Sequence, residues 1–258
     1  MSNAREGRAN VLVAVATYNE IENLPLLIDE LLRLPIELDV LVVDDDSPDG
    51  SGRWAMEESV KCERVHAIVR QNERGLGTAV LRALRYAVDN DYDFVVNMDA
   101  DFSHPTSVVP KLVARISDEE QPQVDVVVGS RYVPGGQTPD WSFKRRAASR
   151  CVNFFARLTL GLTTRDCSGA FRCYRVATLK KLDFNAIVSR GYSFFEEILF
   201  RLMNVGATFA ETPIVFKDRT RGASKINLSE AIKAIWIMSM LWVNRAISKP
   251  NNDAEGSR

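Results

Sequence analysis

The sequence contains few of the side chains that soft metals and disulfide frameworks need. Its 258 residues include four cysteines and two histidines, and no two cysteines have the C-x-x-C spacing that is typical of structural zinc sites. We therefore expect no zinc site and interpret the cysteines as reduced, mostly buried thiols. The sequence also has no uninterrupted apolar segment of the roughly 20 residues that a membrane-spanning helix needs.

The beginning of the chain shows no targeting signal. It reads MSNAREGRAN, without the apolar core of a secretory signal peptide. We therefore expect the protein to stay in the cytoplasm. With 46% hydrophobic and 26% charged residues, the composition is that of a globular domain that can bury a full core. We expect one domain with a short C-terminal addition.

Each part of the chain is poor in charge of one sign. Residues 1–101 contain 10 Lys and Arg against 20 Asp and Glu, whereas residues 102–258 contain 23 against 14. An acidic half followed by a basic half favours a cation and a phosphorylated ligand that meet between them. The alternative is a chance distribution of charge over a solvated surface.

Apolar, β-branched segments alternate with helical patterns along the first half of the chain. The nearly all-apolar runs, such as VLVAVA and DVLVV, indicate strands buried on both faces, which requires helices on both sides of a mostly parallel sheet. The sequence thus predicts a doubly wound α/β domain. The expected strands are Asn10–Ala16, Asp39–Val43, Val65–Val69, Phe94–Met98 and Val124–Val128, and the expected helices are Leu24–Leu34, Gly50–Val60, Thr78–Val88 and Ser107–Ile116.

The second half predicts further elements and a distinct C-terminal helix. We expect a basic helix over Trp141–Leu160, a strand over Ala170–Tyr174, a helix over Phe194–Val205, a strand over Thr208–Phe216 and a last helix over Leu228–Ile247. The expected division is a sheet domain over 9–225, an amphipathic helix over 226–248 and a disordered tail over 249–258.

The last helix contains the apolar run AIWIMSMLWV, which is too short to span a bilayer. Its Trp236, Trp242, Lys233 and Arg245 suit the headgroup region of a membrane. We therefore expect peripheral membrane contact, and the alternative is a helix that packs on the domain or in a dimer interface.

Asp99 and Asp101 form the sharpest chemical motif. They follow the buried segment FVVNM with one residue between them, so both can face the crevice at the carboxyl end of a strand, where open α/β sheets bind ligands. Paired carboxylates favour a hard divalent cation, Mg²⁺ or Mn²⁺, that shares its shell with phosphate oxygens. A solvated acidic turn is the alternative for the motif taken alone.

Two more loops fall at the same predicted edge. The run Asp44-Asp45-Asp46-Ser47-Pro48-Asp49-Gly50 can accept hydrogen bonds from a base or ribose, or can simply cap the next helix. The glycines of Arg74-Gly75-Leu76-Gly77 lack the third glycine of a dinucleotide loop and do not follow the first strand. We interpret that loop as a tight turn that lines the sugar side of the crevice.

Taken together, the segments AVATYNE, VVDDDSPDG, RGLGTA, NMDADFSHP, GSRYV, DCSGAFRCYR, GYSFFEE and RTRGASK resemble family-2 glycosyltransferases of the GT-A fold, and within that family the dolichol-phosphate mannose synthases. The resemblance runs from about Val11 to Lys225. Two positions depart from the family pattern: Ala16 stands where Pro is frequent, and Phe195 stands where Gln is frequent. The second departure removes a polar group that could touch the sugar.

The resemblance implies roles for individual residues. It implies a metal site at Asp99 and Asp101, and catalytic roles for these two residues and Arg131. The implied acceptor-phosphate site consists of Arg131, Arg145 and Ser149. The implied nucleotide-sugar site consists of Ala16, Tyr18, Glu20, Val43, Asp45, Asp99, Ala100, Asp101, Arg219 and Lys225.

The activity that the resemblance implies is transfer of mannose from GDP-mannose to dolichyl or polyprenyl phosphate, with inversion, on the cytoplasmic face of a membrane. The cofactor would be Mg²⁺ or Mn²⁺, and no nucleic acid is involved. Alternatives are a transferase that uses UDP-glucose or another donor, a transferase to a glycan or protein, a nucleotidyltransferase, and a non-catalytic nucleotide-sugar binding module.

Overall fold

The computed structural model describes residues 9–218 and 235–243. A seven-stranded sheet forms its centre, in the order β3-β2-β1-β4-β6-β5-β7. Strand β6 runs antiparallel to its neighbours β4 and β5, and the other pairs are parallel. The strands are β1 (Val11–Thr17), β2 (Asp39–Asp44), β3 (Val65–Val69), β4 (Phe94–Asp99), β5 (Val126–Ser130), β6 (Arg172–Arg175) and β7 (Phe209–Pro213).

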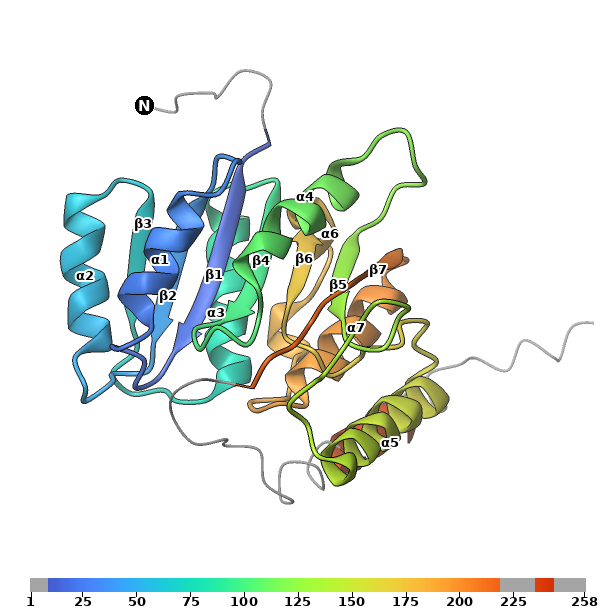
Figure 1. Ribbon diagram of the computed structural model, residues 1–258. Helices are drawn as coiled ribbons and strands as arrows, with labels where there is room; N and C mark the ends of the chain where they lie inside the picture. The colour runs from blue at the N-terminus through green and yellow to red at the C-terminus, as the bar shows by residue number, and fades with distance from the viewer. Residues whose placement is uncertain (1–8, 219–234, 244–258) are drawn as a thin grey trace, which may run out of the picture.

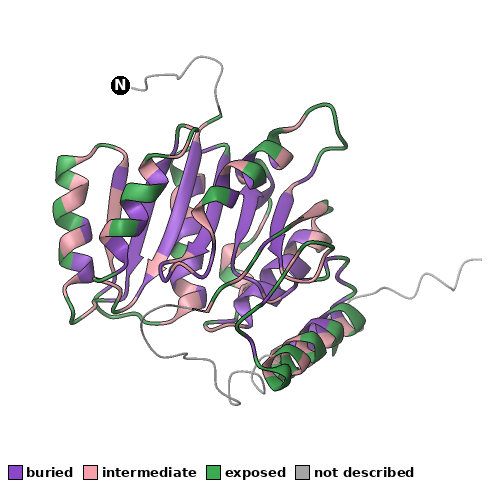
Figure 2. Ribbon diagram, viewed as in Figure 1, coloured by how far each residue is buried: buried purple, intermediate pink, exposed green. Residues whose placement is uncertain are grey.

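Helices cover both faces of the sheet, as the apolar strands require (Figure 1). One hydrophobic core lies between the sheet and α1, α2 and α4, and the other lies between the sheet and α3, α5, α6 and α7. Figure 2 shows the inner strands as an almost continuous buried layer, whereas most residues of the edge strands β3 and β7 are of intermediate burial. The helices are α1 (Leu24–Leu32), α2 (Ser51–Lys61), α3 (Leu76–Asp89), α4 (Val109–Ser117), α5 (Phe143–Leu160), α6 (Val176–Leu179) and α7 (Phe194–Asn204), with short 3-10 turns η1 (Thr106–Val108) and η2 (Phe184–Ala186).

The predicted doubly wound α/β class is confirmed, and most expected elements are present within two residues of their expected ends. The last strand ends at Pro213, three residues earlier than expected. Residues 214–216 are not part of it: Ile214 is buried, and Gln137 forms an isolated bridge with Val215, donating to the Ile214 carbonyl and accepting from the Phe216 amide.

The described part of the C-terminal helix, residues 235–243, has two different faces. Met238 and Leu241 are buried in the same core cluster as Ala156 and Leu160 of α5 and α7 residues. The Trp236 and Trp242 side chains are 66% and 51% exposed. This segment therefore packs on the domain through one face and leaves its aromatic face outside. The expected boundary at residue 225 and the expected tail 249–258 lie outside the described residues.

No helix within the described ranges is both long and apolar enough to cross a membrane.

Candidate active site

The register of the central strands brings the predicted donor-side residues to one level. Ala16 of β1 lies opposite Val43 of β2 on one side and opposite Asp99 of β4 on the other. The polar loops that follow these strands therefore leave the sheet side by side at its carboxyl edge. This is the edge at which open α/β sheets bind ligands.

A cavity of about 460 Å³ opens at that edge. It collects the predicted nucleotide and metal residues from loops that are distant in sequence. Seven of its lining residues were not in the predicted site, and they come from the end of β1, from the loops before α3 and α7 and from α3 itself. The predicted residues in its wall are Ala16, Tyr18, Glu20, Asp45, Asp99, Ala100 and Asp101; the additional ones are Thr17, Arg74, Gly75, Leu76, Ala79, Gly191 and Tyr192.

Three members of the predicted nucleotide site are placed differently or are not described. Val43 has no exposed surface and belongs to the sheet core, so its side chain is structural and does not line the cavity. Arg219 and Lys225 lie outside the described residues. Phe195, the departure from the family pattern, is also buried in the core, so a polar side chain there would not reach the cavity directly.

The turn that carries Asp99 and Asp101 is fixed from beneath by a buried histidine. The Asp99 amide donates to Nδ1 of His104 over 3.1 Å, and the Ser103 amide donates to the Asp101 carboxylate over 3.1 Å. The His104 ring stacks on Phe171 at a centroid distance of 5.0 Å. Burial is the main reason that the pKa of His104 falls to about 4, so at neutral pH its Nδ1 remains available as an acceptor.

The two aspartates suit a divalent ion that also binds phosphate. Asp101 is buried, whereas one third of the Asp99 side chain is exposed. Across the described ranges, no three Asp, Glu, His or Cys side chains gather closely enough to form a complete metal cage. A carboxylate pair at the wall of an open cavity fits Mg²⁺ or Mn²⁺, which are commonly held by one or two carboxylates together with substrate phosphates.

Asp45 connects the cavity wall to the loop before α3. Its Oδ1 accepts from Nε of Arg70 over 2.8 Å and also pairs with Nη2 of Arg70, while its Oδ2 accepts from the Gly75 amide over 2.8 Å. Arg70 further donates to Thr78 Oγ1. Sequence reasoning missed Arg70, because nothing in the local sequence marks it as the partner of a carboxylate 25 residues away. The Asp45 carboxylate thus holds the glycine loop in place at the cavity.

The glycines of this loop allow a close approach to the segment before α7. A side chain at Gly77 would come within 2.8 Å of the Phe194 Cβ and 2.9 Å of the Arg190 carbonyl carbon. Gly75 has φ +132° and would meet the Arg190 carbonyl oxygen at 2.8 Å. The glycines therefore serve packing, which agrees with the interpretation of a tight turn and not of a dinucleotide loop.

Arg131, which directly follows β5, forms a buried ion pair. Its Nε and Nη2 donate to the two oxygens of Asp166 over 2.7 and 2.6 Å, and its side chain is 8% exposed. The attraction of Arg131 keeps the pKa of Asp166 low in spite of burial. We expected Arg131 to hold the acceptor phosphate directly, but in this structure its fork is occupied by Asp166. Its guanidinium also lies beside the Trp141 ring.

Arg145 and Ser149 lie beside Arg131, as predicted. The guanidinium carbons of Arg131 and Arg145 are 5.2 and 4.2 Å from the centroid of the Trp141 ring. Ser149 Oγ accepts a hydrogen bond from the Tyr132 hydroxyl over 2.6 Å. Arg145 also pairs with Asp218 over 2.7 Å, with both side chains about one third exposed. The structure therefore gathers the three predicted acceptor residues around Trp141 and Tyr132.

The buried carboxyl group of Glu196, which interacts with Asp166 and Arg131, makes the stability of the fold depend on pH. Burial raises the pKa of Glu196 from 4.5 to about 7, and its Oε2 has no hydrogen-bond partner. Because the folded state holds this proton more tightly, stability decreases as the pH rises from about 4.5 through about 7. We expect Glu196→Gln to be more stable than the unmodified protein above pH 8, by up to about 3 kcal/mol, with little difference at pH 4.5. Urea unfolding at both pH values measures this.

Glu197 provides the control for that measurement. It is fully buried and paired with Arg201, and it accepts from the amides of Val188 and Ser189. Glu197→Gln is therefore expected to lower stability at both pH values. If Glu196→Gln raised the free energy of unfolding equally at pH 4.5 and pH 8, ionisation of the Glu196 carboxyl group would not be the cause of the gain.

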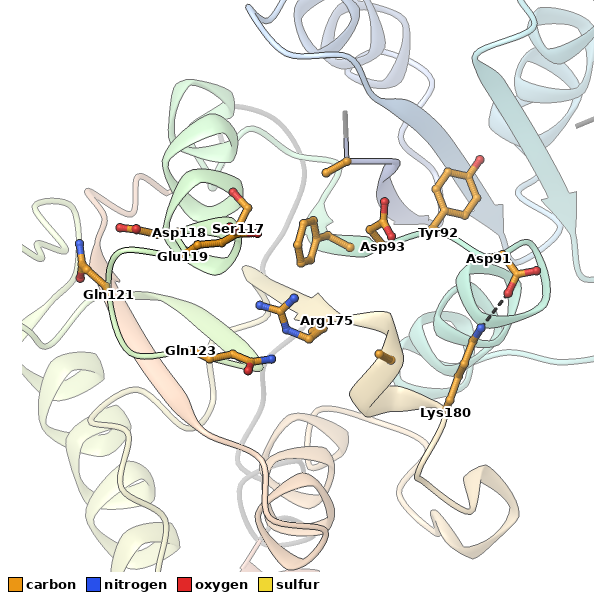
Figure 3. Close-up of a pocket in the computed structure, with 13 residues that line it drawn as sticks. Asp91, Tyr92, Asp93, Ser117, Asp118, Glu119, Gln121, Gln123, Arg175 and Lys180 are labelled. Atoms are coloured by element: carbon orange, nitrogen blue, oxygen red, sulfur yellow. Dashed lines mark hydrogen bonds and ion pairs between the residues drawn. The ribbon is translucent and has the colours of Figure 1, made fainter. Parts of the chain in front are cut away.

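A larger cavity, of about 780 Å³, lies at the opposite edge of the sheet (Figure 3). None of the predicted site residues lines it. Lys180 in its wall is paired with Asp91 over 2.7 Å, and Arg175 donates to the carbonyls of Ile116 and Val124. Lys180 and Arg175 are thus paired with other groups of the protein. The larger volume of this cavity therefore does not make it the active site.

Comparisons with known proteins show the family of this chain. The Glycosyl transferase family 2 model matches residues 12–183. The chain is 38% identical over 237 residues to the undecaprenyl-phosphate mannosyltransferase of Micrococcus luteus, covering 90% of this chain and 96% of that protein. It is 37% identical over 226 residues to the polyprenol monophosphomannose synthase of Mycolicibacterium smegmatis, covering 87% of this chain and 84% of that protein.

Solved structures share the fold at lower identity. One is a mannosyltransferase from Pyrobaculum calidifontis in complex with GDP-Man and Mn²⁺, with a TM-score of 0.58, 17% identity, and coverage of 95% of this chain and 66% of that chain. Another is glucosyl-3-phosphoglycerate synthase from Mycobacterium tuberculosis with Mn²⁺ and UDP, with a TM-score of 0.60, 17% identity, and coverage of 95% and 82%. The match of most of the chain to the family model, together with two relatives above 30% identity, places this protein in glycosyltransferase family 2, with the GT-A fold.

Proposed function

We propose that the protein transfers mannose from GDP-mannose to a polyprenyl phosphate, of the dolichyl or undecaprenyl type, and yields the β-linked mannosyl phosphate. The observation that carries this proposal is the convergence at one sheet edge of a donor cavity containing Asp99 and Asp101 and a cationic cluster around Trp141. The names of the two curated relatives, both enzymes of mannose and a polyprenol, supply the substrate class.

On the donor side, Asp99 and Asp101 would hold Mg²⁺ or Mn²⁺. When bound, the ion stabilises the negative charge of the departing nucleoside diphosphate. The Mn²⁺ in two structural neighbours supports a divalent ion. Tyr18, Glu20 and Asp45 form the cavity wall at which the nucleotide would lie. We include Arg219 and Lys225 as cations for the diphosphate on the grounds of the sequence alone.

On the acceptor side, Arg145 and Ser149 orient the lipid phosphate, and the Arg131–Asp166 pair fixes the wall behind them. A phosphate monoester is already anionic at neutral pH, so it needs no strong general base. Its oxygen bonds to the sugar C1 as the bond from C1 to the diphosphate oxygen breaks, which inverts the anomeric centre. Positioning of the two substrates then supplies much of the rate enhancement.

A donor panel tests this function. Purified protein receives GDP-mannose, UDP-glucose or other nucleotide sugars with polyprenyl phosphate in detergent, with and without a chelator, and transfer of radiolabel to lipid is measured. We expect transfer from GDP-mannose that the chelator abolishes, and release of GDP. Transfer from UDP-glucose and not from GDP-mannose would show that the proposed donor is wrong. Release of pyrophosphate would indicate a nucleotidyltransferase.

A nucleotide-sugar binding module without catalysis is the alternative from another class. It predicts that donor binds in the presence of metal while no label reaches any lipid. The cluster of Arg145, Ser149 and Trp141 argues against it, because a module that only binds a donor has no use for an acceptor-phosphate site.

We further propose that the protein acts as a peripheral protein on the cytoplasmic face of a membrane. Support comes from the exposed Trp236 and Trp242 on the C-terminal helix, since tryptophan favours the membrane–water interface. Exposed Phe143, Phe154 and Leu158 on α5 add apolar surface. Co-sedimentation with vesicles of neutral lipid tests the contact, and protein that remains entirely in the supernatant would refute it.

A further inference from the structure

A third cavity lies along α5, outside the donor cavity, and its wall is rich in arginine. It measures about 450 Å³. None of its lining residues is acidic. They are Arg131, Tyr132, Val133, Gly136, Arg150, Asn153, Phe154, Arg157 and Arg165. Because Arg131 is neutralised by Asp166, the excess positive charge of this cavity comes from Arg150, Arg157 and Arg165.

These three arginines are exposed, and no ion pair among the described residues involves them. Arg150 and Arg157 are seven residues apart on α5 and therefore point to the same side of the helix. Residues 143–160 include five Lys or Arg and no Asp or Glu. The described neighbours thus leave the charge of the cavity uncompensated, and an anion is the ligand that would complete it.

The frame of the cavity is rigid, although its arginine ends are exposed. Asn153 is 3% exposed, and its Oδ1 accepts from the Cys167 amide over 2.6 Å while its Nδ2 donates to Ser168 Oγ over 3.1 Å. The Arg165 amide donates to Glu211 over 2.7 Å. The loop that carries Arg165 is therefore tied both to α5 and to β7, so the backbone positions from which the three arginines extend are held relative to one another.

The apolar side chains at the rim indicate which anion. Phe154 lines the cavity and is 66% exposed, and Leu158, one turn further along the helix, is 70% exposed. A free metabolite would gain nothing from such a rim, whereas a lipid places its phosphate among cations and its chains beside apolar surface. We propose that this cavity, the α5 arginine pocket, binds the phosphate headgroup of an anionic membrane phospholipid. The proposal rests on the proposed peripheral membrane function and names its lipid partner.

The test uses the full chain with Arg150→Gln, Arg157→Gln and Arg165→Gln combined. A control triple, Arg53→Gln, Lys111→Gln and Lys181→Gln, removes the same charge from exposed positions on other elements. Binding to vesicles of phosphatidylcholine, alone or mixed equally with phosphatidylglycerol, is measured by co-sedimentation at about 0.1 M salt, where the screening length is about 10 Å. Each cation at an anionic surface strengthens binding roughly fivefold.

We expect the pocket triple to bind the phosphatidylglycerol vesicles about 100-fold more weakly, with neutral vesicles unaffected, and the control triple to change binding less than about twofold. An equal loss of vesicle binding in both triple variants would show that only the overall charge of the protein matters. Unchanged vesicle binding of the pocket triple would refute the proposed site. Calorimetric titration with inorganic phosphate separates the sources: tight binding of free phosphate, abolished in the pocket triple while vesicle binding persists, would overturn the lipid assignment.

The same variants separate this proposal from the proposed function. Vesicle binding is measured without donor or acceptor, so it stands even if no mannose is transferred. In detergent micelles with polyprenyl phosphate, the pocket triple is expected to keep the unmodified kcat. A loss of kcat there would instead assign these arginines to the acceptor site.

Discussion

Replacing Asp101 by Asn is expected to reduce sugar transfer by on the order of 1000-fold while the protein stays folded. The substitution keeps the shape of a buried side chain and its acceptor for the Ser103 amide, but it removes the negative charge that would hold the divalent ion. Loss of several kcal/mol of charge stabilisation on the departing diphosphate corresponds to that factor. Radiolabel transfer from GDP-mannose to polyprenyl phosphate measures the rate, and Mn²⁺ binding in the presence of GDP measures the ion directly.

Asp46→Asn is the matched control. Asp46 lies in the acidic run after β2, is exposed and has φ +55°, a conformation that Asn tolerates. It does not line the donor cavity. We expect transfer within about twofold of the unmodified protein, since exposed surface substitutions have small effects. If Asp101→Asn retained full turnover and Mn²⁺ affinity, the assignment of the aspartate pair would be wrong.

Removing Asp166 is expected to destabilise the protein by about 3–5 kcal/mol, because it leaves the Arg131 guanidinium buried without its carboxylate. For a chain of this size, that corresponds to a fall in Tm of roughly 10 °C. Asp166→Ala can be compared by thermal unfolding with Asp218→Ala. The latter breaks the Arg145 pair, whose side chains are about one third exposed, and is expected to cost at most about 1 kcal/mol.

A double variant distinguishes charge from packing. Arg131→Met combined with Asp166→Leu removes both buried charges and should recover part of the lost stability. If Asp166→Ala were no more harmful than Asp218→Ala, the buried pair would not be a main support of this side of the site.

The sequence predicted best what depends on local pattern. The nearly all-apolar β1 and β2 require burial on both faces, and the polar residues after β1, β2 and β4 had to meet at one edge because parallel strands end together. This reasoning placed Asp45 and Asp99 together, as the structure has them, and Tyr18, which the resemblance implied, lies in the same cavity.

The sequence did not predict which residues pair with the charged side chains of the site. Arg131 and Asp166 are 35 residues apart, and Arg70 and Asp45 are 25 apart, so each pair depends on how loops from different strands come together. Val43 was placed in the nucleotide site by resemblance, yet it is in the core, because its side chain points to the α3 side of the sheet. Only the three-dimensional register determines that direction.

The C-terminal segment 235–243 contributes to the hydrophobic core through one face and carries the exposed tryptophans of the proposed membrane contact on the other. Since Met238 and Leu241 complete the core beside Ala156 and Leu160, a nascent chain released before residue 238 would leave that apolar surface open to chaperones and to aggregation. Proteolytic removal of this segment would therefore open the core at the same time as it removed the proposed membrane contact. Shedding and inactivation would be one event.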